Sequence, residues 1–136
     1  MDTWLLVGRV VFSLIFIGSG IGQMAEHEGS TAYAEGKGVG NPGLMVRIVS
    51  VAMLAGGVAV MLGIWTDLAF LLIAIMVMAL AFTAHAFWKE DGMAQQMEMS
   101  HFMKNLSIAG GALIGFALYG SGYELRQIVG PIGLLD

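Results

Sequence analysis

Residues 101–123, HFMKNLSIAGGALIGFALYGSGY, decide the fold of this chain. A cation and an amide, Lys104 and Asn105, open the stretch, and no charged residue follows in 106–123. Small residues recur at every fourth position: Ser107, Gly111 and Gly115. This spacing puts them on one helical face, where a second helix can approach closely. The stretch therefore predicts a membrane-spanning helix over about 104–120 with a smooth packing face and a polar start.

The composition is typical of a protein that lies in lipid. Of the 136 residues, 57% are hydrophobic and only 12% are charged. The net charge of −4, with only six Lys and Arg residues, excludes nucleic acid as a partner, because neutralising phosphates requires clustered cations. The absence of cysteine excludes disulfides, thiolate catalysis and thiolate metal ligands.

Three further apolar stretches predict partners for this helix. Residues 4–22 are long enough to span ~30 Å of hydrocarbon, and Asp2 stands where a signal peptide would be basic. Helices are also expected over about 44–64 and 68–86, joined by so short a link that they must be antiparallel neighbours. Asp91 is a candidate cap for a helix that continues into the fourth segment.

The expected fold is all-α. Residues 1–136 should form a single domain, an integral-membrane up-down four-helix bundle, which satisfies backbone hydrogen bonds inside lipid. Residues 121–136 alternate polar and apolar character, which favours a short amphipathic tail. The expected location is a prokaryotic inner or plasma membrane, crossed several times.

The positive-inside rule bears on the orientation. The two long connectors, 23–43 and 88–103, lie on one side of the membrane together with the helix ends beside them. Four cations lie on this side: Lys37, Arg47, Lys89 and Lys104. The opposite side holds Arg9 and Arg126, so the count places the connectors in the cytoplasm.

Polar residues at membrane depth are expected to gather on the connector side. The helix order gives Gln23, Arg47, His85, Lys104 and Asn105 a common membrane face. Ionisable residues inside a membrane are costly and often functional. Such a mouth could hold a quinone head group, which needs donors to its carbonyl oxygens, or an anionic lipid head group. The alternative is that the cations extend to the interface and His85 makes an ordinary interhelical hydrogen bond.

Arg9 lies inside the first apolar stretch and needs a partner or access to water. Two interpretations are open: it extends to the near interface, or it forms a structural charge pair with Asp67 on the same side of the membrane.

No metal site is predicted. The adjacent residues Glu26, His27 and Glu28 cannot all converge from a regular helix. The methionine-rich run 93–103 leaves copper as an open alternative, because thioether and imidazole suit Cu(I), although methionine is also a common apolar filler. No haem pair, flavin motif, nucleotide loop or nucleophile triad is present. No intrinsic cofactor is therefore expected, and a non-catalytic subunit is favoured over an independent enzyme.

Five segments together resemble the DoxX family of small bacterial and archaeal membrane proteins. They are RVVFSLIFIGSGIGQ (9–23), YAEGKGVGNPG (33–43), AGGVAVMLG (55–63), HAFW (85–88) and FMKNLSIAGG (102–111). The resemblance implies a four-helix membrane protein. The family name derives from a subunit of a thiosulfate:quinone oxidoreductase, and other members are linked to redox and oxidative-stress complexes.

This chain departs from the family pattern at two positions. Members often have Lys where Gln23 stands and Glu where Met53 stands. If those residues form a charged pair, this chain has lost both partners together, which suits the removal of a structural pair and speaks against proton-coupled catalysis. Relatives often have basic termini, which implies that the termini lie inside, against the charge count above.

Three functions follow from these observations. The first is a membrane subunit of a redox-linked complex that gives a quinone- or lipid-facing anchoring surface and carries no redox centre. The second is a small-molecule or lipid binder or carrier, and the third is a structural accessory subunit. The expected partners are membrane lipid and either other membrane subunits or further copies of this chain.

Overall fold

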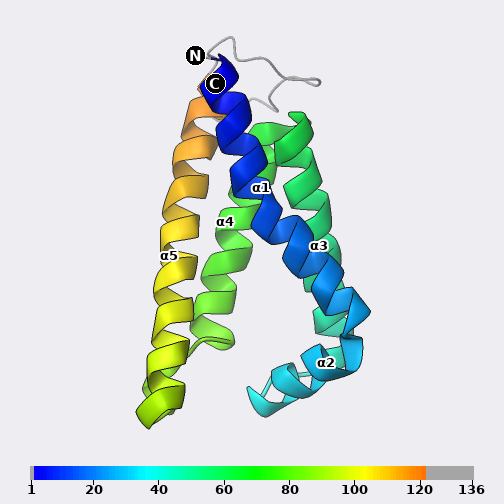
Figure 1. Cartoon of the computed structure of the whole chain (residues 1–136), viewed down its shortest axis with the longest axis vertical. Coiled ribbons are helices and arrows are strands. Elements are labelled where there is room, and N and C mark those ends of the chain that lie inside the picture. The colour runs from blue at the N-terminus through cyan, green and yellow to red at the C-terminus, as the bar shows by residue number, and fades with distance from the viewer. Residues whose placement is uncertain (1, 122–136) are drawn as a thin grey trace.

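The computed structural model describes residues 2–121, and this part of the chain is helical (Figure 1). The helices, in chain order, are α1 (Asp2–Ala25), α2 (His27–Gly36), α3 (Pro42–Leu62), α4 (Thr66–Thr83), the 3-10 turn η1 (Phe87–Lys89) and α5 (Gly92–Gly120). The predicted amphipathic tail begins at the last described residue, Ser121, and otherwise lies outside the described residues.

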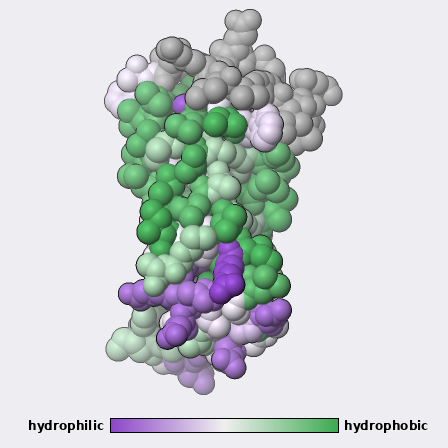
Figure 2. Space-filling model, turned by 90° about the vertical axis from the view of Figure 1, so that its right-hand side faces the viewer, coloured by the Kyte–Doolittle hydropathy of each residue, from purple (hydrophilic) through white to green (hydrophobic). Residues whose placement is uncertain are grey.

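The predicted four-helix membrane fold is confirmed. Four of the described helices are long and apolar enough to cross a membrane: α1, α3, α4 (with its continuation to Lys89) and α5. Figure 2 shows an apolar band across the molecule, with polar side chains gathered below it at the end that holds α2. The distribution of hydropathy along the molecule therefore matches a bundle that spans lipid.

The elements differ from the prediction in two places. The fourth spanning helix begins at Gly92 and not near 104, because the Met, Ala, Gln and Glu residues of 93–99 are good helix formers. Asp91 does occupy the N-cap position, although its side chain makes no capping hydrogen bond. The segment 23–43, predicted only as a polar, glycine-rich connector, contains α2.

The spanning helices are arranged as two pairs. α1 packs along α3, and α4 packs along α5. The pairs meet where the rings of Phe12 and Phe70 lie 5.1 Å apart and where Gly56 lies against Ile73. In Figure 1 they separate toward the lower end, where α2 runs across the molecule. The connector end is therefore the open end of the bundle.

Glycines allow the closest helix contacts, but only in part those that the four-residue spacing predicted. Gly115 lies against the ring of Phe70, as a packing glycine should. Ser107 and Gly111 are exposed, so they do not belong to a buried stripe. The buried face of α5 instead carries alternating small, polar and aromatic residues: Phe102, Asn105, Ala109, Ala112 and Tyr119. The face of α5 that contacts α4 is thus rotated by part of a helical turn from the face that the small residues predicted.

Candidate functional site

A polar network centred on Glu98 lies at the connector end. The Tyr33 hydroxyl donates to Glu98 Oε1 at 2.9 Å, and the Lys37 ammonium lies 2.9 Å from the same oxygen. His85 Nδ1 lies 2.7 Å from Glu98 Oε2. Since a carboxylate only accepts hydrogen bonds, these contacts place the His85 proton on Nδ1. Three donors from α2 and from the residues after α4 thus converge on one carboxylate of α5.

The carboxylate at the centre of this network is buried. Glu98 is only 7% exposed, and a buried carboxylate requires partners. Lys37 makes a second ion pair, also at 2.9 Å, with the more exposed Glu90. Tyr33 adds a 3.4 Å hydrogen bond to the carbonyl of Ala84. Because Tyr33 and Lys37, the C-cap residue of α2, are four residues apart, they lie on the same side of the helix.

The network continues into a pair of imidazoles. The rings of His85 and His101 are stacked, with their centroids 5.1 Å apart. Lys104 follows His101 by three residues, which is about one helical turn. Glu98, His101 and Lys104 therefore follow one another at three-residue intervals on α5, and His85 lies against the first two.

The Tyr33 hydroxyl gives a direct test of the network. Burial, the hydrogen bond to Glu98 and the nearby negative charge of Glu98 raise the pKa of Tyr33 from 10.0 to about 12. Burial lowers the pKa of Lys37, but its hydrogen bonds to Glu98 and Glu90 outweigh this and raise it above the usual value. Both groups are therefore protonated below pH 10 while they are bound to Glu98.

We expect alkaline pH to weaken the docking of α2 on Glu98. A folded-state pKa above the unfolded value contributes stability that is lost as pH rises through the folded pKa, here between about pH 10 and 12 for Tyr33. Tyrosinate absorbance during an alkaline titration should show a late phase that belongs to Tyr33. In Glu98→Gln that late phase should move toward pH 10. An unchanged titration would contradict the hydrogen bond.

Aromatic rings fill the space beside the network. Phe82, Phe87 and Trp88 all pack against Phe102, with ring centroids 5.2, 5.3 and 5.8 Å away. Trp88 is half exposed. This cluster fits the belt of aromatic residues expected at a membrane interface.

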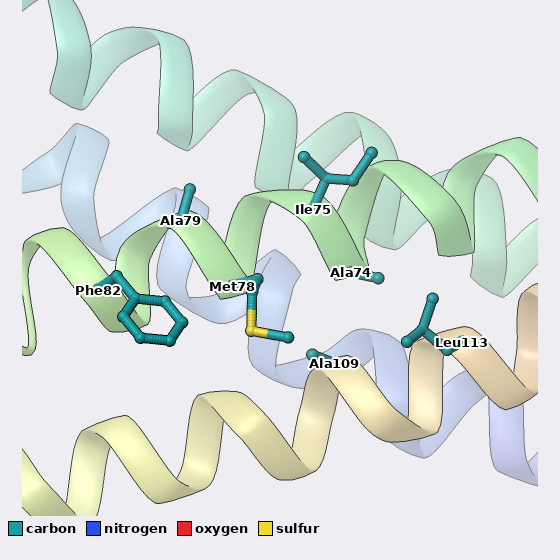
Figure 3. A pocket seen from close by; sticks show the side chains of 7 residues that line it. All are labelled: Ala74, Ile75, Met78, Ala79, Phe82, Ala109 and Leu113. Atoms are coloured by element: carbon teal, nitrogen blue, oxygen red, sulfur yellow. The ribbon is translucent and has the colours of Figure 1, made fainter.

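An apolar groove of about 350 Å³ lies between α4 and α5 (Figure 3). Phe82 belongs both to this groove and to the aromatic cluster. The groove is lined by Ala74, Ile75, Met78, Ala79, Phe82, Ala109 and Leu113. With no charged or hydrogen-bonding side chain in its wall, it can hold hydrocarbon but cannot recognise a head group.

The five residues of the predicted mouth fall into separate groups. Gln23 accepts a 3.1 Å hydrogen bond from Ser50 and approaches Met53 Sδ at 3.8 Å. His85 belongs to the Glu98 network. No hydrogen bond or ion pair found between residues 2 and 121 joins any two of the five, so their shared site stays a prediction.

Because α5 begins at Gly92 and not near 104, the two predicted mouth residues on this helix lie well inside it. Lys104 and Asn105 lie more than three turns after Gly92, about 18 Å along the helix. Lys104 is exposed, whereas Asn105 is buried on the face toward α4. Arg47 is exposed near the start of α3.

Gln23 and Met53, the two positions at which this chain departs from the DoxX pattern, are in contact. These are the two positions at which the family resemblance implies Lys and Glu, and here they touch across α1 and α3. A charged pair at these positions would be sterically possible. In this chain the two positions hold an amide and a thioether.

The predicted Arg9–Asp67 pair lies at the opposite end. Arg9 Nη2 donates to the carbonyl of Met61 at 3.2 Å. Its guanidinium also lies against Gly63, where a Cβ would come within 2.9 Å. Asp67 is fully buried in the first turn of α4. Arg9 therefore faces the α3–α4 turn rather than open lipid, while its pairing with Asp67 stays a prediction.

Sequence reasoning missed Tyr33, Lys37, Glu90 and Glu98. One signal was present: Glu98 stands between two methionines, and an acid among apolar helix residues usually has a partner. The partner could not be read from spacing, because Tyr33 lies 65 residues away in the chain. Within residues 2–121, no three His, Asp or Glu side chains gather in a way that could hold a metal ion.

Comparison with known proteins agrees with this architecture. The sequence model of the DoxX family matches residues 4–86. The chain is 33% identical over 129 residues to the Escherichia coli inner membrane protein YqjF, covering 94% of this chain and 93% of that protein. It is 31% identical over 118 residues to the E. coli inner membrane protein YphA, covering 87% and 84%. No solved structure matches. The chain is a multi-pass cell-membrane protein and belongs to the DoxX family.

Proposed function

We propose that this protein is the membrane-embedded subunit of a redox-linked complex. It presents a head-group site for a quinone or an anionic lipid and anchors partner subunits, which carry the redox centres. The proposal is supported by the register of α5, which turns the exposed Lys104 toward the α1 side of the bundle, and by the amide of Gln23 at the connector end of α1.

The orientation of Lys104 follows from the register of α5. Lys104, Gly111 and Gly115 are spaced by seven and four residues, so they share one helical face. A Cβ at Gly111 would lie 4.0 Å from the Phe12 ring of α1, and a Cβ at Gly115 would meet Phe70. The face that carries Lys104 therefore turns toward α1 and not toward the outer groove.

The orientation of Gln23 follows in the same way. Phe12, Phe16 and Gln23 share one face of α1, and Phe12 packs on Phe70 of the other pair. Gln23 therefore lies at the connector end of a face that contacts α3 and, nearer the middle of α1, the other pair, and its own amide contacts Ser50 of α3. An ammonium and an amide on opposing helices are suitable donors to the carbonyl oxygens of a quinone. The same ammonium would attract an anionic head group.

Co-purification tests the subunit assignment. An affinity-tagged chain, extracted from its native membrane in mild detergent, should retain at least one partner polypeptide carrying a redox cofactor. Mass spectrometry of the extract should also find a quinone or an anionic lipid, and the compound found distinguishes the two ligands. A chain that purifies alone in its native membrane extract, without a partner at any detergent concentration, would contradict the assignment.

The apolar groove favours a second candidate, a lipid-binding or carrier protein. Filling the groove with Ala109→Phe should then remove a co-purifying lipid, whereas Ala117→Phe, on an exposed part of α5, should not. A self-sufficient protein that loses lipid only in Ala109→Phe would favour this function over the redox subunit. A partner-bound chain that holds no small molecule would favour the structural accessory role.

A further inference from the structure

The attachment of α2 to the bundle is unusual for a packed helix. None of its residues is buried. Its N-terminal half rests on α3, where His27 and Thr31 lie 3.8 Å from the position of a Cβ at Gly43. Its C-terminal half reaches the other helix pair through Tyr33 and Lys37. Since little apolar surface is removed from water, polar contacts must hold this half in place.

Those contacts converge on a single buried group. Tyr33 and Lys37 both reach Oε1 of Glu98 at 2.9 Å, and only Lys37 has a second acidic partner, Glu90. Glu98 belongs to α5, on the opposite side of the open end from α1 and α3 (Figure 1). α2 therefore joins the two helix pairs at the end where they separate.

The chain on both sides of α2 is suited to movement. Glu26 interrupts the helical path between α1 and α2, with φ −111° and ψ 51°. After α2, Gly38 has φ +77°, which strongly favours glycine. Gly36, Gly38 and Gly40 have no atom within 4 Å of the position of a Cβ. A rotation of α2 about these points would break no packing contact at the glycines.

We propose that α2 is a reversible strap, held closed by Glu98, that controls ligand access to the proposed head-group site from the open end of the bundle. Release of Tyr33 and Lys37 from Glu98 frees the C-terminal half of α2. The Glu98 network lies along α5 from His101 and Lys104, so the strap crosses the same end as the head-group site. This gating role rests on the proposed function, whereas the docking of α2 on Glu98 does not.

Distance measurements between spin labels test the docking. Because the chain has no cysteine, Ala32→Cys on α2 and Gln95→Cys on α5 allow labelling at two exposed positions of the otherwise unaltered protein. In lipid nanodiscs the labelled protein should give one narrow distance distribution. Adding Tyr33→Phe and Lys37→Met should shift the distribution to longer values and broaden it. The control Lys89→Met removes an exposed cation at the same end of the molecule and should leave the distance distribution unchanged.

A second label pair, Ile48→Cys on α3 with Gln95→Cys, reports on the helix pairs themselves. The strap predicts that this distance stays constant in the Tyr33→Phe, Lys37→Met protein. An unchanged α2–α5 distance would overturn the proposal, because the polar contacts would then not hold α2. A change in both distances would also overturn it, since the network would then support the whole bundle.

Ligand exchange tests the gate separately from the site. An added quinone analogue should bind and dissociate several-fold faster in the Tyr33→Phe, Lys37→Met protein than in the Lys89→Met control. Equal rates alongside a longer α2–α5 distance would overturn the gating role while leaving the docking intact. Absence of binding in both proteins would instead contradict the proposed function, and the gating role with it.

Discussion

Gly20→Val should prevent stable packing of α1 on α3. A Cβ at position 20 would lie 2.7 Å from Leu54 Cγ and 2.9 Å from the backbone carbonyl of Ser50. The leucine can change rotamer, but the carbonyl cannot move unless the helices separate. We expect a loss of about 3 kcal/mol or more, at the upper end of overpacking effects. The apparent melting temperature in mild detergent should fall by roughly 10 °C.

Gly18→Val is the matched control. It lies two residues away on the same helix, and no atom lies within 4 Å of a Cβ at this position. It adds the same side chain to the same apolar segment, so it should melt close to the wild type. Equal losses in the two variants would mean that α1 does not pack on α3 through Gly20.

Glu98→Leu should give the second large effect. It leaves the Tyr33 hydroxyl and the His85 Nδ1 proton without their carboxylate and removes one of the two ion pairs of Lys37. Removing one partner of a buried charge network costs about 3 kcal/mol, because the other groups remain desolvated. A detergent melt of Glu98→Leu should show this loss, and α2 should exchange its amide hydrogens faster.

Glu90→Leu controls for the loss of an acid from the same network. The Glu90 side chain is 34% exposed and forms an ion pair with Lys37. Exposed pairs contribute at most about 1 kcal/mol. A Glu90→Leu protein that melts as low as Glu98→Leu would show that Glu98 is not the centre of the network.

The sequence was sufficient for the spanning helices because their signal is local. An apolar run of helix length is enough to identify a membrane span, and Pro42 and Asp91 mark the beginnings of α3 and α5. The fourth spanning segment was placed from about 104 because polar residues lower the hydropathy of 95–101, although Asp91 was proposed as the cap of a helix that continues into it. A helix that extends beyond lipid has no need to be apolar there, so hydropathy alone cannot locate its end.

The Glu98 network could not be predicted because it depends on tertiary contacts. The hydropathy of α2 is too low for a span, and its helical signal is too short to stand out from a connector. Tyr33 and Lys37 meet Glu98 only because α2 folds back across the open end. His85 was expected near Lys104, yet its recorded hydrogen bond is to Glu98, a residue that the expected helix boundary had excluded.

Photoaffinity labelling tests the central claim, that a head group binds between the two helix pairs. The protein, in nanodiscs free of endogenous quinone, is illuminated with an azido-quinone and its labelled peptides are identified by mass spectrometry. We predict labels on α5 around Lys104 and on α1 around Gln23, displaced by unlabelled quinone and lost in Lys104→Met but not in Lys89→Met. Labels confined to the outer α4–α5 groove, or insensitive to competitor and to Lys104→Met, would contradict the account.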